Sequence, residues 1–278
     1  MSTKVCIIWD YDSAIGQVNS SYPYNFHEES LLTEIQNVEK ILDLAKEREL
    51  KMTFAVVGFA AERGQFPYHV PNQIRAIADA GHEVASHSWR HEWFPFLERE
   101  QVRRSLKRSK EALERCIGKP GGVKGFVPPF SRPMSWYGRF AVSLGDRTFG
   151  PGFPGASLGS LLKLVGEAGY KWCRVVYKPL WRRVARSEPG PSSVFWCGEV
   201  ACIPQHTCGF GEKALTLLNQ SIERERALVV TGHPLGLSLP HEEHEKKLER
   251  FLSHLSDLQA RGRVRVCTVQ ELVGLEVC

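Results

Sequence analysis

The sequence lacks the features that mark membrane-spanning proteins, small secreted proteins and nucleic-acid-binding proteins. No apolar run is long enough to cross a bilayer, and the run at residues 5–9 is too short for the core of a signal peptide. The eight cysteines include no Cys-x-x-Cys pair and lie mostly in apolar stretches. We therefore expect buried, reduced thiols in a cytoplasmic protein. The net charge of +5, from 36 basic and 31 acidic residues, is too small for a dedicated nucleic-acid binder.

Strand-like and helix-like segments alternate along the 278 residues without a low-complexity linker, so we expect one domain over residues 1–278. This alternation is typical of parallel α/β architecture, which either closes into a barrel or stays open as a doubly wound sheet. Strands are predicted at residues 5–9, 51–57, 83–86, 123–127, 171–177, 193–203 (two strands joined by a turn), 227–231 and 264–267. Helices are predicted at residues 30–49, 71–80, 98–117, 157–168, 213–225, 241–261 and 269–275, with one short helix at 135–144 in a long loop.

Two aspartates end the first predicted strand, in the segment Trp9-Asp10-Tyr11-Asp12. Side chains at positions i and i+2 point to the same side of an extended chain, and the carboxyl ends of parallel strands are where such folds place active sites. Two carboxylates at this spacing repel one another unless a positive charge lies beside them. A metal held by one aspartate would leave the other free to take a proton. A pair of turn aspartates without a metal explains the motif equally well.

Two histidines four residues apart, His87 and His91, follow the third predicted strand. On one helical turn this spacing directs both imidazoles to one side. With one carboxylate they would make a site of two histidines and one carboxylate that leaves positions open for water and substrate. The pair alone is weak support, because the chain has ten histidines. Combined with the aspartates at the end of the first strand, it predicts a binding site for one divalent metal.

These motifs resemble those of the polysaccharide deacetylase (NodB homology) family, which pairs an acidic motif after its first strand with His-x-x-x-His after its third. The resemblance spans most of the chain. The Asp-x-Asp form is similar to a cytosolic branch of peptidoglycan-deacetylase-like and cyclic-amide-hydrolase-like proteins. It implies an α/β fold, a distorted (β/α)7-type barrel that is NodB-like. It also implies Asp10 as the base and Asp12, His87 and His91 as metal ligands. Zinc is the first choice of metal, with cobalt, nickel, manganese or iron as alternatives.

A second family motif, which forms the substrate groove, aligns with residues 125–130. The resemblance implies that Pro129 belongs to this groove and that the backbone N–H of Phe130 helps to hold an oxyanion. Val127 stands where the family has an arginine that contacts the base aspartate. Since valine cannot donate a hydrogen bond from its side chain, another group must hold the base, and Arg132 is the nearest candidate.

A third motif places His233 after a late predicted strand. The resemblance implies that His233 is the general acid; a capping histidine at a strand–loop junction is the structural alternative. The family aspartate that orients this histidine has no clear counterpart, because Cys173 and Arg174 occupy that region. The orientation and the pKa of His233 must therefore be set in another way.

Three further side chains are candidates for substrate binding. His206 follows a predicted strand near the same edge, so a substrate contact and a satisfied loop histidine explain it equally well. Trp136 and Tyr137 lie in the long loop and either line a substrate cleft or pack within the loop. His82, directly before a predicted strand, is interpreted as a buried structural histidine.

Together the motifs predict a hydrolase of C–N amide bonds, an N-deacetylase or deformylase of an amino-sugar-containing substrate. A cyclic amide or imide hydrolase would use the same site. A haloacid-dehalogenase-type phosphatase also fits a strand ending in Asp-x-Asp, but that class needs a second acidic pair and no Asp-Asp occurs here. A non-catalytic binding protein would not need this full residue set. The expected partner is a small molecule or carbohydrate precursor, not nucleic acid, and a homo-oligomer is left open.

Overall fold

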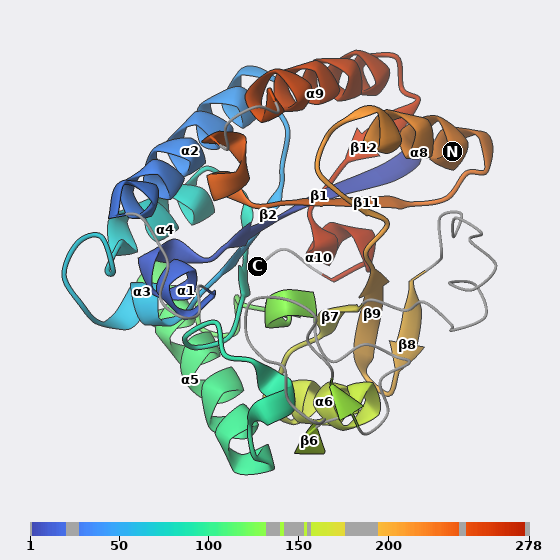
Figure 1. Ribbon diagram of the computed structural model, residues 1–278. Helices are drawn as coiled ribbons and strands as arrows, with labels where there is room; N and C mark the ends of the chain where they lie inside the picture. The colour runs from blue at the N-terminus through green and yellow to red at the C-terminus, as the bar shows by residue number, and fades with distance from the viewer. Residues whose placement is uncertain are drawn as a thin grey trace.

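Strands and helices alternate along the chain in the computed structural model (Figure 1). The structure describes residues 2–20, 28–131, 157–175, 194–238 and 243–275, together with the short strands β5 (Phe140–Ala141) and β6 (Phe153–Pro154). The main sheet contains β1 (Thr3–Tyr11), β2 (Thr53–Val56), β3 (Glu83–Ser86), β4 (Gly125–Phe126), β7 (Trp172–Val175), β8 (Phe195–Cys197), β9 (Val200–Pro204), β10 (Thr207–Cys208), β11 (Leu228–Gly232) and β12 (Val264–Val266).

The helices of the described residues lie mostly around the outside of this sheet (Figure 1). They are α1 (Ser13–Ser20), α2 (Glu28–Glu47), α3 (Phe59–Glu62), α4 (Pro71–Asp79), α5 (Arg99–Ile117), α6 (Leu158–Glu167), α8 (Glu212–Glu223), α9 (His244–Ala260) and α10 (Val269–Leu272). Three 3-10 turns accompany them, η1 (Phe94–Phe96), η2 (Pro129–Ser131) and η3 (Pro234–Ser238).

The sheet is strongly curled into a half-barrel. Its strand order is β10-β11-β1-β2-β3-β4-β7-β9-β8, with β12 also beside β1, and every pairing is parallel except β8 with β9. After β9, the Gln205 N–H donates to the Val175 carbonyl oxygen, and the next N–H, of His206, donates to that of Val229. This stretch therefore leads from β7 across to β11. The predicted α/β barrel-like fold is confirmed, and a flat doubly wound sheet is excluded.

Both faces of the sheet are buried, which explains why its strands are continuous apolar runs. On β1, Ile7 and Trp9 belong to the larger core beneath the helices, whereas Cys6 and Ile8 belong to the smaller core inside the curl. Trp172 fills part of that inner core, and its ring lies directly against Gly125 of the neighbouring strand. A Cβ atom at that glycine would lie 2.0 Å from the tryptophan ring. Only glycine leaves room for this close packing.

Sequence patterns do not predict α1, α3 or β10, which are short and owe their conformation to their surroundings. The short helix predicted at residues 135–144 is wrong at Phe140–Ala141, because β5 pairs there antiparallel with β6. The rest of that predicted helix lies outside the described residues.

Seven cysteines fall within the described residues, and all are free thiols. The expectation that they are buried is wrong for Cys197 and Cys208, which are exposed on β8 and β10. Both stand on short strands, whereas the buried Cys6 and Cys202 stand on the longer strands β1 and β9. Among the helices that the structure describes, none is long and apolar enough to cross a membrane.

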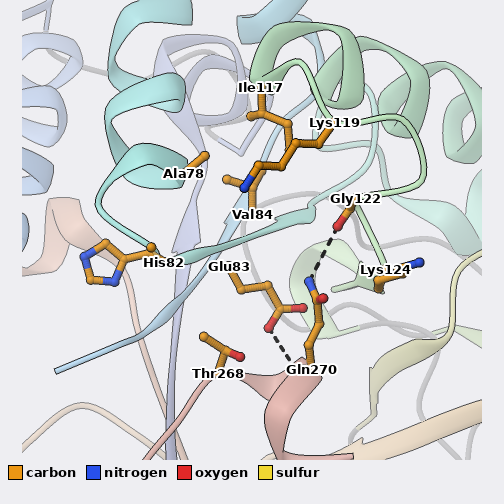
Figure 2. Close-up of a pocket in the computed structure, with 11 residues that line it drawn as sticks. Ala78, His82, Glu83, Val84, Ile117, Lys119, Gly122, Lys124, Thr268 and Gln270 are labelled. Carbon is orange, nitrogen blue, oxygen red and sulfur yellow. Dashed lines mark hydrogen bonds between the residues drawn. The ribbon is translucent and has the colours of Figure 1, made fainter. Parts of the chain in front are cut away.

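Figure 2 shows the end of the half-barrel where the strands begin, beside a cavity of about 60 Å³. The buried carboxylate of Glu83 accepts three hydrogen bonds there, from the Thr53 hydroxyl at 2.8 Å, the Trp172 indole at 2.8 Å and the Gln270 backbone N–H at 3.0 Å. Burial raises the pKa of Glu83, and these three donors oppose that rise. His82 is buried next to it and accepts the Met52 N–H, as expected of a structural histidine. The carboxyl-terminal helix α10 is thereby tied to β2, β3 and β7.

We expect Glu83→Ala to lower the free energy of unfolding by about 2–4 kcal/mol, because it leaves buried donors without an acceptor. Urea denaturation followed by circular dichroism measures this. The matched control is Glu199→Ala, since the Glu199 side chain is 85% exposed in its ion pair with Lys171; that change should cost less than about 1 kcal/mol. Equal effects of the two substitutions would show that the hydrogen bonds to Glu83 do not stabilise this end of the half-barrel.

Candidate metal centre and active site

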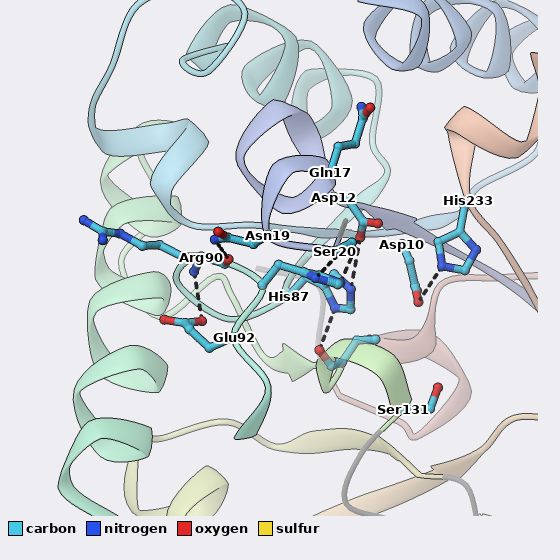
Figure 3. Close-up of polar contacts among 12 residues, drawn as sticks. Asp10, Asp12, Gln17, Asn19, Ser20, His87, Arg90, Glu92, Ser131 and His233 are labelled. Carbon is cyan, nitrogen blue, oxygen red and sulfur yellow. Dashed lines mark hydrogen bonds and ion pairs between the residues drawn. The ribbon is translucent and has the colours of Figure 1, made fainter. Parts of the chain in front are cut away.

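The side chains predicted to bind the metal or to transfer protons lie together at the carboxyl-terminal edge of the curled sheet (Figure 3). Asp10 lies near the end of β1 and Asp12 directly follows that strand, while His87 follows β3 and His233 follows β11. All of these strands are parallel. Because parallel strands present their carboxyl ends at one edge, residues far apart in the sequence meet here.

Asp12, His87 and His91 form a cluster whose ligand atoms all lie within 4.8 Å of one another. The Oδ1 atom of Asp12 is 3.3 Å from Nε2 of His87 and 3.3 Å from Nε2 of His91. Both histidines are buried, and the Asp12 side chain is 16% exposed. The three side chains therefore converge on one point, and Asp12 is the most exposed of the three.

The outer nitrogen of each imidazole is already engaged. The Nδ1 atom of His87 lies 2.7 Å from the backbone oxygen of Val127, which can only accept, so Nδ1 carries the proton. The Nδ1 atom of His91 lies 2.9 Å from the Ser20 hydroxyl. The Nε2 atom of each ring is thus the one that is turned toward Asp12. Outer hydrogen bonds of this kind orient metal-binding histidines.

The residues present fit a divalent cation. Oδ1 of Asp12 is buried and has no hydrogen-bond donor, and it faces the His87 lone pair. Burial lowers the pKa of His91 to about 4, so this imidazole is neutral at pH 7. Burial alone would raise the pKa of Asp12, but the His91 and His87 rings outweigh it and the net shift is downward. Unpaired acceptors of nitrogen and oxygen type repel one another unless a positive ion lies between them.

The loop between the two histidines is not the helical turn that their spacing suggests. Ser88 has φ 69° and His91 has φ 60°, both in the left-handed region. The loop backbone is held from outside, because the Ser88 oxygen accepts the Gly58 N–H and the Ser109 hydroxyl. The ring centroids of His87 and His91 are nevertheless 4.9 Å apart. The prediction of a helix is wrong here, while the predicted convergence of the two rings is confirmed.

Helix α1, which sequence patterns do not predict, packs directly against the cluster. A Cβ atom at Gly16 would lie 2.9 Å from Cβ of Asp12 and 3.3 Å from Cβ of His91. Gln17 on the same helix donates to Glu34 of α2 at 2.8 Å, and Glu34 also accepts the Asp12 backbone N–H at 3.2 Å. Burial, followed by the charge of Asp12, raises the pKa of Glu34 to about 8. Glu34 therefore fixes the backbone that carries Asp12.

Asp10 is held by Arg174, a residue of β7. The guanidinium donates to both carboxylate oxygens, from Nη1 to Oδ1 at 2.5 Å and from Nη2 to Oδ2 at 2.7 Å. Both side chains are buried. Burial alone would raise the pKa of Asp10, but Arg174, with His87 and His233, outweighs it and keeps the pKa below its ordinary value. Arg132, the partner expected from the sequence, lies outside the described residues.

Arg174 stands one strand away from the valine that replaces the expected arginine. In the β4–β7 ladder, Phe126 is opposite Cys173, so the next position on each strand brings Val127 opposite Arg174. Both side chains are fully or almost fully buried. The guanidinium thus reaches Asp10 from the adjacent strand at the same level of the sheet. The sequence contains the signal, an arginine in an apolar strand, but not the information that β7 faces β1 across the curl.

His233 approaches the other side of Asp10. Its Nε2 atom is 3.7 Å from Oδ2 of Asp10, and its side chain is 46% exposed. Burial alone would lower the pKa of His233, but Cys208, followed by Asp10 and Asp12, raises it to about 10. His233 is therefore positioned to carry a proton into the site.

The remaining predicted residues divide into two groups. Phe130 lies in η2 with φ 56°, and its ring centroid is 4.5 Å from that of His91, so η2 with Pro129 borders the metal cluster. His206 accepts the Val229 N–H on its Nδ1 atom at 2.8 Å, which ties that nitrogen to the sheet. Trp136 and Tyr137 lie outside the described residues.

Residues 33–145 match the family model described as polysaccharide deacetylase. A peptidoglycan-N-acetylglucosamine deacetylase of Bacillus cereus is 29% identical over 117 residues, which are 41% of this chain and 38% of that protein. The match thus spans about two fifths of the length of the curated relative. Over this part of its length, the chain is similar to polysaccharide deacetylases.

Solved structures extend this likeness to the whole chain as a likeness of fold. A protein of Mycobacterium smegmatis assigned to the polysaccharide deacetylases aligns with a TM-score of 0.67 at 20% identity, over 98% of this chain and 88% of its own. The PuuE allantoinase aligns with a TM-score of 0.62 at 16% identity, over 96% and 87%. A Bacillus anthracis protein called a CE4 family pseudoenzyme aligns at 0.51 and 15% identity, over 98% and 65%. This fold therefore occurs both with and without catalytic activity.

We expect the purified full-length protein to bind about one divalent ion per chain, measured by plasma mass spectrometry after dialysis. His87→Ala and Asp12→Ala should reduce the bound metal to less than about one tenth, because each removes one of three ligands. His254→Ala, on α9, is the matched control and should keep full occupancy. Full occupancy in the two ligand variants would place the metal elsewhere.

Arg174→Met should raise the pKa of Asp10, since burial then acts without its counter-charge. A base must be ionised, so the acidic limb of the pH profile of kcat/KM should move to higher pH by about one unit or more. Removing one partner of a buried ion pair also costs about 3–5 kcal/mol of stability. Adding Val127→Arg returns a guanidinium from the facing position and should recover part of the activity. An unmoved acidic limb in folded Arg174→Met would show that Arg174 does not hold the base.

Proposed function

We propose that this chain is a metal-dependent hydrolase of a C–N amide bond, with N-deacetylation or deformylation of an amino-sugar-containing substrate as the leading activity. One observation carries the proposal: Asp10, held ionised by Arg174, lies beside a separate three-ligand cluster and 3.7 Å from a histidine that carries a proton. We assign Asp10 as the base, His233 as the acid and the cluster as the cation site. Sequence similarity to a peptidoglycan-N-acetylglucosamine deacetylase over 117 residues supports the amide class.

In this mechanism a bound divalent cation, with zinc as our proposal, would polarise the acyl oxygen and lower the pKa of the attacking water. Asp10 takes the proton from that water, and Arg174 limits the motion of its carboxylate. His233 donates its proton to the departing nitrogen, which converts a poor leaving group into an amine. We assign the backbone N–H of Phe130 to the oxyanion, because its ring already packs against His91.

A second candidate is the ring opening of a cyclic amide, which needs the same base, acid and cation site. The fold shared with an allantoinase supports it, although at 16% identity this likeness concerns the fold. The long loop that would distinguish a sugar from a small ring includes Trp136 and Tyr137. For a cytoplasmic location, which is also our proposal, a small amide or an amino-sugar precursor fits better than a mature wall polymer.

A phosphatase with Asp10 as nucleophile is disfavoured by the same geometry. Both oxygens of Asp10 accept hydrogen bonds from Arg174, which lowers their ability to attack a phosphoryl group. Such a phosphatase would also have no use for two buried histidines that point at the second aspartate.

The test measures acetate, formate and ammonia release from a panel of N-acyl amino sugars and cyclic amides, with the protein loaded with zinc, cobalt, nickel or manganese. At least one amide should be hydrolysed, and Asp10→Asn should lower kcat by about 10²–10⁴, because it removes the general base. Metal content should stay unchanged, because Asp10 is not one of the three ligands. Activity that survives Asp10→Asn, or phosphate release in place of amide hydrolysis, would overturn the proposal.

A further inference from the structure

Cys208 lies beside His233 because of the pairing of two short strands. β10 pairs in parallel with β11, and Cys208 is opposite Thr231, two residues before His233. The Gly209 N–H donates to the Thr231 oxygen at 2.8 Å and continues this ladder. The thiol is exposed, and the strand register puts it on the same face as His233, whose pKa it influences. Cys208 therefore has a defined place at the rim of the site.

The carboxylate nearest to His233 is already occupied. Both oxygens of Asp10 accept hydrogen bonds from Arg174 at 2.5 and 2.7 Å. The 3.7 Å between Oδ2 of Asp10 and Nε2 of His233 is longer than a hydrogen bond. Asp10 thus attracts the imidazole by charge without fixing its orientation, and Cys208 on the neighbouring strand is the next side chain that acts on it.

We propose that Cys208 is the positioning residue of His233, and that the thiol gives its proton to the imidazole to form a thiolate–imidazolium pair. The S–H bond breaks, an N–H bond forms, and His233 keeps the proton that it later donates. This proposal deepens the proposed function and rests on His233 as its acid. The thiolate itself does not touch the substrate in this scheme.

The charges around the pair agree with this assignment. The hydrogen bond from His233 lowers the pKa of Cys208, although burial opposes that shift. The same contact is the largest influence that raises the pKa of His233. The other titratable groups that face His233 are Asp10 and Asp12 at the end of β1, Glu34 on α2 and His91 after β3.

The first test does not require any activity. Iodoacetamide labelling of the folded full-length protein, followed by mass spectrometry, compares Cys208 with Cys197, the exposed thiol on β8. An ordinary thiol is only a few per cent ionised at pH 7, so Cys208 should react about five to ten times faster. His233→Gln should bring the two rates to within about twofold. Equal rates in the unmodified protein would overturn the proposal and leave the metal site and amide hydrolysis untouched.

The second test separates positioning from packing. Cys208→Ala should lower kcat about tenfold with little change in KM, and should move the alkaline limb of the pH profile down by about one unit, because His233 then loses its proton at lower pH. Cys208→Asp restores an anion and should return the limb to its original position, whereas the neutral Cys208→Ser should not. Cys197→Ala should change neither quantity. An alkaline limb that stays in place in Cys208→Ala would contradict the assignment.

Discussion

Two carboxylates two residues apart at the end of one buried strand need two separate positive charges, and the site is arranged around that requirement. Asp10 receives its counter-charge from a guanidinium that binds both of its oxygens. Asp12 receives two imidazoles whose nitrogen lone pairs do not neutralise it, which leaves a place for a cation. Because like charges at this distance cannot both stay ionised without compensation, each aspartate needs its own positive partner.

The curl of the sheet makes this division possible. Arg174 on β7 and Asp10 on β1 are 164 residues apart in sequence, and in a flat sheet with this strand order three strands would separate them. Curling turns the inner faces of β1 and β7 toward one another, so that side chains from opposite sides of the sheet meet. Packing at the end of the half-barrel where the strands begin helps to hold that shape. The hydrogen bond from the Trp172 indole to Glu83 lies at this end. Fold stability and site geometry therefore depend on the same interior.

The sequence predicts the gathering of the candidate residues where it follows from position along a strand. Asp12, His87 and His233 stand after apolar runs, with His91 in the loop after His87, and parallel strands bring such positions to one edge. Prediction fails where the decisive neighbour comes from a distant strand or from an unusual backbone. In the sequence, Arg174 is an arginine in an apolar strand with no evident partner. Only the curl of the sheet brings it to Asp10. The left-handed backbone at Ser88 and His91 carries no sequence signal, because neither position is a glycine.

The central claim is that Asp12, His87 and His91 hold one divalent cation while Arg174 holds Asp10. The most direct measurement is anomalous diffraction at the zinc edge from crystals of the protein grown with zinc. The account predicts one dominant peak about 2.0–2.2 Å from Oδ1 of Asp12 and from Nε2 of both histidines, with the Arg174–Asp10 pair intact. A dominant peak bound to Asp10 in place of Arg174, or no peak at the three ligands, would contradict it.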